Sequence, residues 1–379
     1  MAKITDIKAI ALEHDLGAEH AYGMARGMTA VRNMTLIIVE TDAGVTGYGE
    51  AWGPSAVTLA SVDVVKPYFL DRTIYDREQV APYFYNQRYH AGIQNTLTAA
   101  LGGINIALYD AIGKLHGVPL FNLLGGQHSE RIPAYASNGY FAAHPDNQLV
   151  EQTTSFRDQR FPGVKIKIGA SAANDAERCA AARDILGPDI ALMVDANGNY
   201  TVDQALASMR AIADYDIHFY EEPLPPTDFT GYTELRAAAP MAIAAGEAHY
   251  TGWDFKRLID ERCVDVLQPD LTLCGGLDET KAIWAMTRLA NLRLSLHVWG
   301  GAVGLAAAVH FLASMPASPH TDRIPHPVML EYDRGRNALR DDLLVEPISC
   351  IDGHLTVPTG PGLGVEIDWD MVEKYRINT

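Results

Sequence analysis

The sequence has few cysteines, and their arrangement argues against a disulfide framework. Only four occur among its 379 residues, and none belongs to a CxxC pair. Scattered cysteines in a chain of this length are typical of a protein kept in a reducing compartment. We therefore predict a cytoplasmic location.

Long apolar runs are also lacking. The N-terminal segment MAKITDIKAIALEHDL carries acidic residues within its apolar stretch, unlike a signal peptide, and no run reaches the length of a membrane span. We therefore expect neither secretion nor insertion into a membrane.

Positive charge is scarce as well. The 30 lysines and arginines face 47 aspartates and glutamates, which gives a formal net charge of −17. The resulting negative field repels phosphate backbones and anionic membrane faces, so neither nucleic acid nor a membrane is expected as a partner. An anionic small molecule would need a local group of cations to bind.

Apolar residues, in contrast, make up 48% of the chain, which excludes a disordered class and suffices for one large barrel plus a second small domain. Residues 4–14 and 34–50 alternate apolar and polar positions around a DAG turn, which predicts an antiparallel sheet. Residues 55–120 have helical periodicity. We therefore predict an N-terminal α+β capping domain over residues 1–128, with a linker near the glycine pair 125–126.

Beyond residue 128, short β-rich runs alternate with helical segments such as TVDQALASMRAIADY. The runs are IPAYAS, VKIKIG, ALMVDAN, HFYEEP, MAIAAGE, VDVLQPD, LRLSLHV and PVMLEYD. Eight βα units favour a closed parallel barrel over an open sheet, because a barrel needs eight and leaves no edge strand. The predicted fold class is therefore α/β, a modified TIM-like (β/α) barrel over residues 129–335. Residues 336–379 are expected to return to the capping domain as hairpin and loop material.

Polar residues stand at the C-terminal ends of the second to eighth runs. They are Lys165, Lys167, Asp195, Glu221, Glu247, Asp270, His297 and Glu331. In a barrel, this end of the strands is the active face. The residues from Asp195 to His297 follow one another at intervals of 26, 26, 23 and 27 positions, each close to one βα unit. The spacing therefore predicts that they surround a single mouth.

Three consecutive acidic strand ends predict a metal site. Asp195, Glu221 and Glu247 would repel one another in a low-dielectric mouth unless a divalent cation neutralised them. Ligands that are all oxygen favour Mg²⁺ or Mn²⁺ over zinc. Taken singly, each acid also fits a structural role in a turn, before a proline or in a core ion pair. Glu222 adjoins Glu221, so the sequence leaves open which of the two points inward.

Lys165 and Lys167 are two positions apart on one strand, so both side chains face the same side. In a central parallel strand this side is the barrel interior, whereas in an antiparallel edge strand it would be solvent. Crowding by each other and by the metal is expected to lower their pKa values, as a lysine base requires. We predict that Lys167 is a base.

His297 and Asp270 lie on neighbouring predicted strands. A carboxylate in this position holds one tautomer of the imidazole and raises its basicity, so the pair predicts a second base. A single histidine at a strand end is more often structural. Glu331 is expected to donate a proton or a hydrogen bond to a substrate carboxylate, although a structural acid fits equally well.

The motifs that carry these residues, KIK, VDAN, YEEP, AGE, QPD and HVWG, resemble those of the enolase superfamily, specifically its mandelate racemase subgroup. The resemblance spans nearly the whole chain. It implies a metal held by the three acids, with Lys167 and the His297–Asp270 pair as bases on opposite faces of the substrate. It also implies that Lys165 and the metal stabilise an enediolate. A homo-oligomer is implied by the family alone.

The implied chemistry removes the proton alpha to a carboxylate, a first step that racemisation, dehydration and lactone opening share. The runs HVWGGAVGLAAAVHFLASM and EYDRGRNALRDDLL look most like acid-sugar enzymes of the galactarolactone cycloisomerase type. We therefore predict a cycloisomerase or dehydratase whose partner is a small-molecule acid sugar or its lactone. The alternatives are a racemase or epimerase of a 2-hydroxy acid, and a catalytically silent, metal-dependent sugar-acid binder.

Two loops, EHDLGAEHAYGMARGM and GEAWGPS, are expected to choose the substrate, because the family uses them as lids. His20, Tyr22 and Trp52 in these loops are predicted to bind substrate, against the alternative of ordinary loop packing. Asn197, in the VDAN motif, is a further substrate-binding candidate. The stretch GGAVG at 300–304 is a weak candidate for the phosphate loop of a different kind of barrel.

Overall fold

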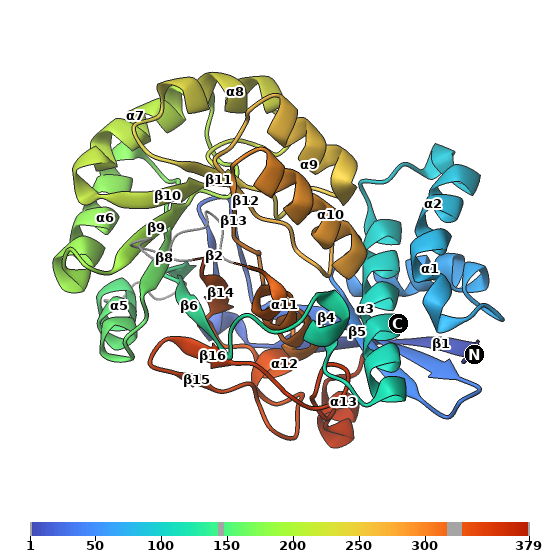
Figure 1. Ribbon diagram of the computed structural model, residues 1–379. Coiled ribbons are helices and arrows are strands. Elements are labelled where there is room, and N and C mark those ends of the chain that lie inside the picture. The colour runs from blue at the N-terminus through green and yellow to red at the C-terminus, as the bar shows by residue number, and fades with distance from the viewer. Residues whose placement is uncertain (1, 143–147, 317–327, 378–379) are drawn as a thin grey trace.

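The computed structural model describes residues 2–142, 148–316 and 328–377. Figure 1 shows a curved sheet ringed by helices, with a smaller layer of strands and helices beside it. The last segment of the chain, drawn in red, runs beside both parts. Of the helices described, none combines the length and the apolar character needed to cross a membrane.

The smaller part is built on an antiparallel sheet. Its strands are β1 (Ile4–Asp15), β4 (Val31–Thr41) and β5 (Thr46–Ala51), in the order β1-β4-β5. The turn between β4 and β5 contains Gly44 at φ 73°, a conformation that glycine adopts without a steric cost. The sheet predicted from the alternating apolar pattern is therefore confirmed.

Helices α1 (Ser55–Val65), α2 (Arg77–Gln87) and α3 (Thr96–His116) follow this sheet, within the region that periodicity predicted to be helical. Helix α3 approaches β5 very closely, because a Cβ atom added to Gly49 would lie 2.0 Å from the carbonyl oxygen of Gly103. The glycines of β5 thus fix the distance between the sheet and its longest helix.

The larger part is a parallel sheet of eight strands that alternate with helices, as predicted. The strands are β6 (Arg131–Asn138), β8 (Gly163–Lys167), β9 (Ala191–Asp195), β10 (Ile217–Glu221), β11 (Ile243–Ala245), β12 (Val266–Leu267), β13 (Arg293–Leu294) and β14 (Leu330–Asp333). The helices that follow the first seven are α5 (Gln148–Asp158), α6 (Ala172–Leu186), α7 (Val202–Ile212), α8 (Phe229–Ala238), α9 (Thr251–Asp260), α10 (Gly276–Leu289) and α11 (Ala302–Ser314). Pro327, the first residue of the predicted eighth run, lies outside the described residues.

Backbone pairing links these strands in the order β13-β12-β11-β10-β9-β8-β6-β14. Between the two end strands, Ser295 Oγ donates to the carbonyl oxygen of Met329 at 3.3 Å. No backbone pairing between β13 and β14 is present in the described ranges, and this side-chain contact bridges the two ends of the curved sheet.

Alternate residues of each strand face the inside of the curved sheet. On β9, Leu192 and Val194 belong to the large core, whereas Met193 belongs to a separate interior cluster with Tyr135 and Phe219. Asp195 lies two positions beyond Met193 and therefore shares its face. The interior cluster forms a packed floor beneath the residues at the strand ends.

The C-terminal segment contacts both parts of the molecule. Its hairpin of β15 (Cys350–Ile351) and β16 (His354–Thr356) pairs antiparallel with the start of β6. Its helix α13 (Trp369–Tyr375) is followed by Ile377, whose N–H donates to the carbonyl oxygen of Ala11 in β1 at 3.1 Å. The exact domain boundaries that we proposed from the sequence stay predictions.

A third, small sheet was not predicted. It pairs β2 (Tyr22–Met24) antiparallel with both β3 (Gly27–Thr29) and β7 (Phe141–Ala142). This sheet joins the first predicted lid to the segment that follows β6, and so fixes the lid over the C-terminal ends of the barrel strands.

Candidate active site

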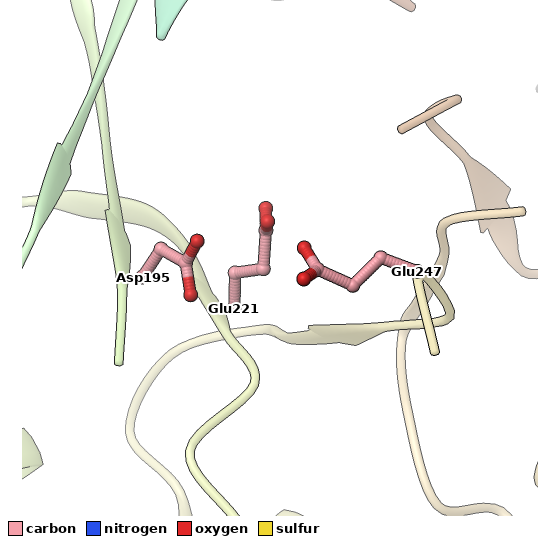
Figure 2. Close-up of side chains that lie close together, drawn as sticks. All are labelled: Asp195, Glu221 and Glu247. Atoms are coloured by element: carbon pink, nitrogen blue, oxygen red, sulfur yellow. The ribbon is translucent and has the colours of Figure 1, made fainter. Parts of the chain in front are cut away.

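Three carboxylates meet at the C-terminal ends of neighbouring strands (Figure 2). Asp195 ends β9, Glu221 ends β10, and Glu247 follows β11 by two residues. Asp195 and Glu221 are direct register partners in the sheet. One carboxylate oxygen from each of the three acids lies within 4.8 Å of the other two. The acids that the sequence spacing assigned to one mouth are therefore close enough to share a single cation.

The structure distinguishes Glu221 from its neighbour Glu222. Glu221 supplies an oxygen to the triad, whereas the backbone of Glu222 turns through a positive φ of 38°. The Glu222 carboxyl is buried, and this burial, with Glu247 nearby, raises its pKa well above the usual value. Burial also raises the pKa of Glu221, to about 8, so the position of its oxygen in the triad, and not its charge, makes Glu221 the candidate ligand.

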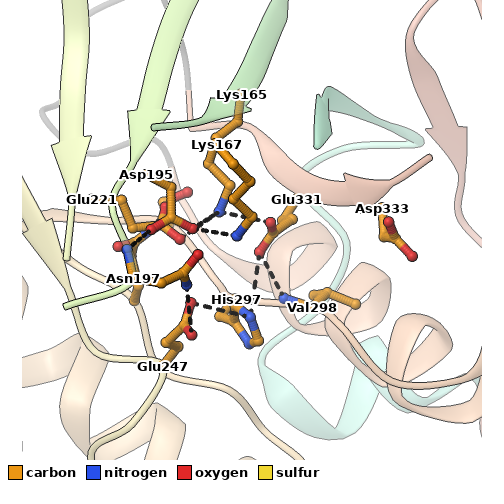
Figure 3. A network of polar contacts seen from close by, with 12 residues as sticks. Lys165, Lys167, Asp195, Asn197, Glu221, Glu247, His297, Val298, Glu331 and Asp333 are labelled. Carbon is orange, nitrogen blue, oxygen red and sulfur yellow. Dashed lines mark hydrogen bonds and ion pairs between the residues drawn. The ribbon is translucent and has the colours of Figure 1, made fainter. Parts of the chain in front are cut away.

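Both lysines of β8 point into the barrel, in agreement with their spacing, and join a polar network with the acids (Figure 3). Lys165 Nζ lies 2.7 Å from Glu331 Oε1 and also contacts Glu221. Lys167 Nζ lies 2.5 Å from Asp195 Oδ2. The two ammonium groups therefore offset part of the negative charge of the mouth.

The side chains of the mouth alone raise both lysine pKa values, whereas the lowered values that we predicted assumed a bound metal. Burial lowers the pKa of Lys165, but the carboxylates of Glu221 and Glu331 outweigh it and hold the pKa well above its usual range. Burial likewise lowers the pKa of Lys167, and Asp195 more than compensates, so that this pKa is also raised. A cation bound to the same acids would take up part of their charge and shift both lysines toward the neutral form.

His297 and Asp270 form the hydrogen-bonded pair that the sequence predicts. His297 Nδ1 lies 2.7 Å from Asp270 Oδ2, and Asp270 Oδ1 accepts from the N–H and the hydroxyl of Thr272 at 2.7 and 2.6 Å. On the other side of the ring, His297 Nε2 lies 3.4 Å from Glu247 Oε2. Burial lowers the pKa of His297, but the surrounding carboxylates, Glu247 first, raise it to about 10.

Glu331 on β14 contacts groups from both sides of the mouth. Its Oε1 lies 2.7 Å from Lys165 Nζ, and its Oε2 lies 4.0 Å from His297 Nε2 and accepts from the Val298 N–H at 3.2 Å. Burial raises its pKa, but Lys165 and then His297 lower it to about 2. The carboxylate form is therefore favoured, and a carboxylate can only accept hydrogen bonds, so neither the proton donation nor the hydrogen-bond donation predicted for Glu331 is supported.

The predicted lid residues differ in their positions. The Trp52 ring lies 5.8 Å from that of His297, and the Tyr22 ring lies 6.0 Å from that of Trp299, two residues beyond His297. Tyr22 and Trp52 thus border the network. His20, in contrast, is exposed in a short 3-10 helix and is not part of the network.

Two polar side chains hold acids of the triad in place. The backbone N–H of Asn197 donates to Asp195 Oδ1 at 2.8 Å, and its Nδ2 lies 3.5 Å from Glu247 Oε1. Gln268, which the sequence reasoning missed, donates from Nε2 to Glu221 Oε2 at 2.5 Å. A signal was available, because the QPD motif places this glutamine directly after β12, at the same end of the barrel as its aspartate.

Glu50 on β5 was also missed. Its two carboxylate oxygens accept from the N–H groups of Gly301 and Gly304, at the start of α11, at 2.5 and 2.7 Å. Burial raises its pKa to about 7, although these two N–H groups act in the opposite direction. The GGAVG stretch considered for phosphate binding therefore binds a carboxylate of the chain itself.

The fold and the strand-end residues define a barrel enzyme with a capping domain and a carboxylate-rich mouth. More specifically, the chain belongs to the mandelate racemase and muconate lactonizing enzyme family of the enolase superfamily. Residues 8–125 match the mandelate racemase / muconate lactonizing enzyme N-terminal domain, and residues 148–371 match the enolase C-terminal domain-like family. The family predicted from the sequence motifs is thus confirmed.

Relatives with assigned activities cover almost the whole chain. D-galactarolactone cycloisomerase from Agrobacterium fabrum is 34% identical over 377 residues, which are 99% of each chain. Arabinonate dehydratase from Saccharolobus solfataricus is 33% identical over 89% of each chain. The crystal structure of 3,6-anhydro-D-galactonate cycloisomerase from Zobellia galactanivorans superposes with a TM-score of 0.89 at 34% identity, covering 99% of this chain and 100% of the other.

The enolase superfamily depends on magnesium. A racemase from Streptomyces coelicolor, 25% identical to this chain with a TM-score of 0.86 over 99% of this chain and all of the other, has a crystal structure with bound magnesium. The carboxylate triad of this chain is a group of the kind that such an ion requires.

Proposed function

We propose that this chain uses Mg²⁺ to remove the proton alpha to the carboxylate of an acid sugar, and that it acts as a cycloisomerase or dehydratase. The observation that carries the proposal is a carboxylate triad with a titratable side chain, Lys167 or His297, beside each end. Lys167 contacts Asp195 at one end of the triad, and His297 lies beside Glu247 at the other. The names of the cycloisomerase and dehydratase relatives support the substrate class.

Asp195, Glu221 and Glu247 would hold the cation. Their oxygens converge within 4.8 Å, and a site made only of oxygen ligands suits Mg²⁺, with Mn²⁺ as the alternative. When bound, the cation supplies positive charge that stabilises the negative charge developing on the substrate carboxylate as the α-proton leaves.

The side chains around the triad are placed to move protons. One of Lys167 Nζ and His297 Nε2 takes the α-proton, and the other returns a proton or assists the departure of a β-oxygen. Asp270, bonded to Nδ1 of the imidazole, keeps Nε2 directed toward the mouth. Lys165, held between Glu221 and Glu331, is placed to donate to the substrate carboxylate.

A racemase or epimerase is the second candidate, because two bases at opposite ends of the triad also allow one to remove the proton and the other to return it. Product stereochemistry in deuterated water separates the two reactions. Elimination breaks the bond between the β-carbon and its oxygen, which leaves as water in a dehydratase and stays in the product as a free carboxylate when a lactone is opened, whereas racemisation gives the inverted substrate with deuterium at the α-carbon.

A panel of aldarates, aldonates and their lactones, incubated with Mg²⁺ in deuterated water and followed by NMR, tests the proposal. We expect the α-proton of at least one acid sugar to be lost, and Lys167→Met to reduce turnover roughly 10²- to 10⁴-fold. Lys256→Met, on the exposed face of α9, serves as the control and should leave turnover unchanged. Full turnover in Lys167→Met would contradict its role as a base. Absence of both turnover and exchange across the panel would favour a silent binder.

A further inference from the structure

Arg32, on β4 of the capping sheet, is a buried cation that borders the active site. The residue is 2% exposed, and its Cζ lies 4.3 Å from the centre of the Tyr22 ring and 4.1 Å from that of the Trp299 ring. Its Nη2 lies 3.1 Å from Asp333 Oδ2. Its Nε and Nη1 are buried, and neither has a hydrogen-bond partner among the residues that the structure describes.

Unpartnered donors on a buried charge are unfavourable, because the group has lost water without gaining another acceptor. They are rare in folded proteins, and each one calls for a specific explanation. The rest of the Arg32 guanidinium is firmly held, since two aromatic rings and Asp333 fix its position. Its free N–H groups are therefore preorganised to donate to a bound acceptor.

The position of these donors relates them to the proposed chemistry. The Trp299 ring that stacks on Arg32 lies 5.9 Å from Lys167 Nζ, and the Tyr140 ring lies 5.5 Å from the same atom. The Tyr140 hydroxyl donates in turn to Asp333 Oδ1 at 3.3 Å. In Figure 3, Asp333 lies beyond Glu331 as seen from the triad. Arg32 thus borders the mouth on the side away from the proposed metal.

The local charge favours an anionic ligand. Asp333 is shared between two guanidinium groups, because Arg340 Nη1 lies 3.4 Å from the Oδ2 atom that pairs with Arg32. The other acid beside Arg340 is Asp341, which is 48% exposed and therefore screened by water. Two guanidinium groups thus face one buried carboxylate, and Asp341, which accepts from Arg340 at 2.8 and 2.7 Å, offsets the charge of Arg340 and not that of Arg32.

We propose that Arg32 binds a second carboxyl group, at the end of the substrate that is far from the carboxylate on the metal. The planar donors of a guanidinium match carboxyl oxygens well. The substrates are then aldarates or their lactones, and aldonates are poor ligands. This inference rests on the proposed function and specifies its substrate class.

The test compares an aldarate with the aldonate of the same hydroxyl configuration, which lacks only the far carboxylate. The preference is the ratio of kcat/KM values if both are turned over, and otherwise the ratio of dissociation constants measured by calorimetry with Mg²⁺. We expect the wild type to prefer the aldarate on the order of 10- to 100-fold, as for one charge-assisted contact. Arg32→Met should lose most of this preference, because its constants for the aldarate should fall much further than those for the aldonate.

Arg77 offers a matched control in the same part of the chain. Its Cζ lies 4.4 Å from the centre of the Tyr109 ring and its Nε lies 3.5 Å from Asp278 Oδ2, so it is also a ring-stacked, acid-paired arginine, but it lies outside the mouth. Arg77→Met should keep the wild-type preference. An equal loss on both ligands in Arg32→Met, or a wild-type preference for the aldonate, would overturn the inference.

If Arg32→Met does not fold, Arg32→Lys keeps the charge with fewer planar donors and should show a reduced preference; an unchanged preference would count against the inference. Exchange of the α-proton in deuterated water is recorded in parallel. Absence of exchange with every acid sugar contradicts the proposed function, whereas the ratio of dissociation constants still decides the role of Arg32.

Discussion

At the scale of single residues, the acids of the mouth serve two sets of partners. Lys165 contacts Glu221 and Glu331, Lys167 contacts Asp195, and His297 lies beside Glu247, so each member of the proposed metal triad already has a basic neighbour. A divalent cation would compete with these lysines for the same oxygens. The lysines would then be released toward the substrate, which couples metal binding to the availability of the base.

Asp270 is expected to act on catalysis through His297, because its Oδ2 lies 2.7 Å from Nδ1 of the ring. Asp270→Asn keeps the shape of the side chain but removes the charge that favours the required tautomer. We expect kcat to fall roughly 10²- to 10⁴-fold, with a much smaller change in KM, because Asp270 bonds to the imidazole from the side opposite the triad. Steady-state kinetics on any acid sugar that is turned over would measure this.

Thr272→Val is the matched control for this variant. It removes one hydrogen bond to Asp270 Oδ1 but leaves the contact between Asp270 and His297 in place. Its effect on kcat should therefore be much smaller. A loss as large as that of Asp270→Asn would show that the loop conformation, and not the contact with the ring, limits the rate.

At the scale of secondary-structure elements, the carboxylate of Glu50 is one of the groups that join the capping sheet to the barrel. Glu50, near the end of β5, accepts from two N–H groups at the start of α11, and this helix begins five residues after His297. Unpaired N–H groups and the positive end of the helix dipole make such a start attractive to a carboxylate. The capping domain thus holds the segment that carries the proposed base.

Glu50 should make stability depend on pH. Its pKa rises from 4.5 to about 7 in the folded chain, mainly through burial, so folding favours the protonated form. Its contribution to stability is complete below pH 4.5 and is lost as the pH rises toward 7, by about 3 kcal/mol for a shift of this size. Urea denaturation across this range should show a smaller decrease in the free energy of unfolding for Glu50→Gln than for the wild type.

Glu151→Gln, at an exposed position on α5, provides the comparison for Glu50→Gln. It makes the same chemical change without removing a buried carboxyl group, so its pH profile should follow that of the wild type. Parallel profiles for all three proteins would contradict the role assigned to Glu50.

Elements whose signals are local could be predicted from the sequence, and elements that depend on distant pairing could not. The strand β9 was found from the short apolar run ALMVDAN, and α7 from the helical periodicity of a segment that begins at Thr201. The sheet of β2, β3 and β7 was missed, because it pairs two short segments more than a hundred residues apart. Neither segment has a pattern of its own that indicates a strand.

At the scale of the whole molecule, the same distinction holds for the active site. Residues from the barrel were predictable, because one residue per βα unit appears in phase with the fold. Arg32 and Glu50 approach the mouth from the capping domain, and both are buried. The alternation of apolar and polar residues along their strands does not indicate which charged side chain is buried. The expected homo-oligomer and the expected cellular location both concern more than the single chain, and both stay predictions.

Removal of divalent metal should destabilise the whole chain, because the triad joins three strands of the barrel. Binding to the folded state alone adds about 2.7 kcal/mol when Mg²⁺ is present at 100 times its dissociation constant. We expect the Tm measured by calorimetry to be higher with Mg²⁺ than with EDTA, and this difference to vanish in the double variant Asp195→Asn, Glu221→Gln. Asp203→Asn, an exposed acid on α7, should keep it. An undiminished Mg²⁺ effect in the double variant would place the ion elsewhere and contradict the triad as its site.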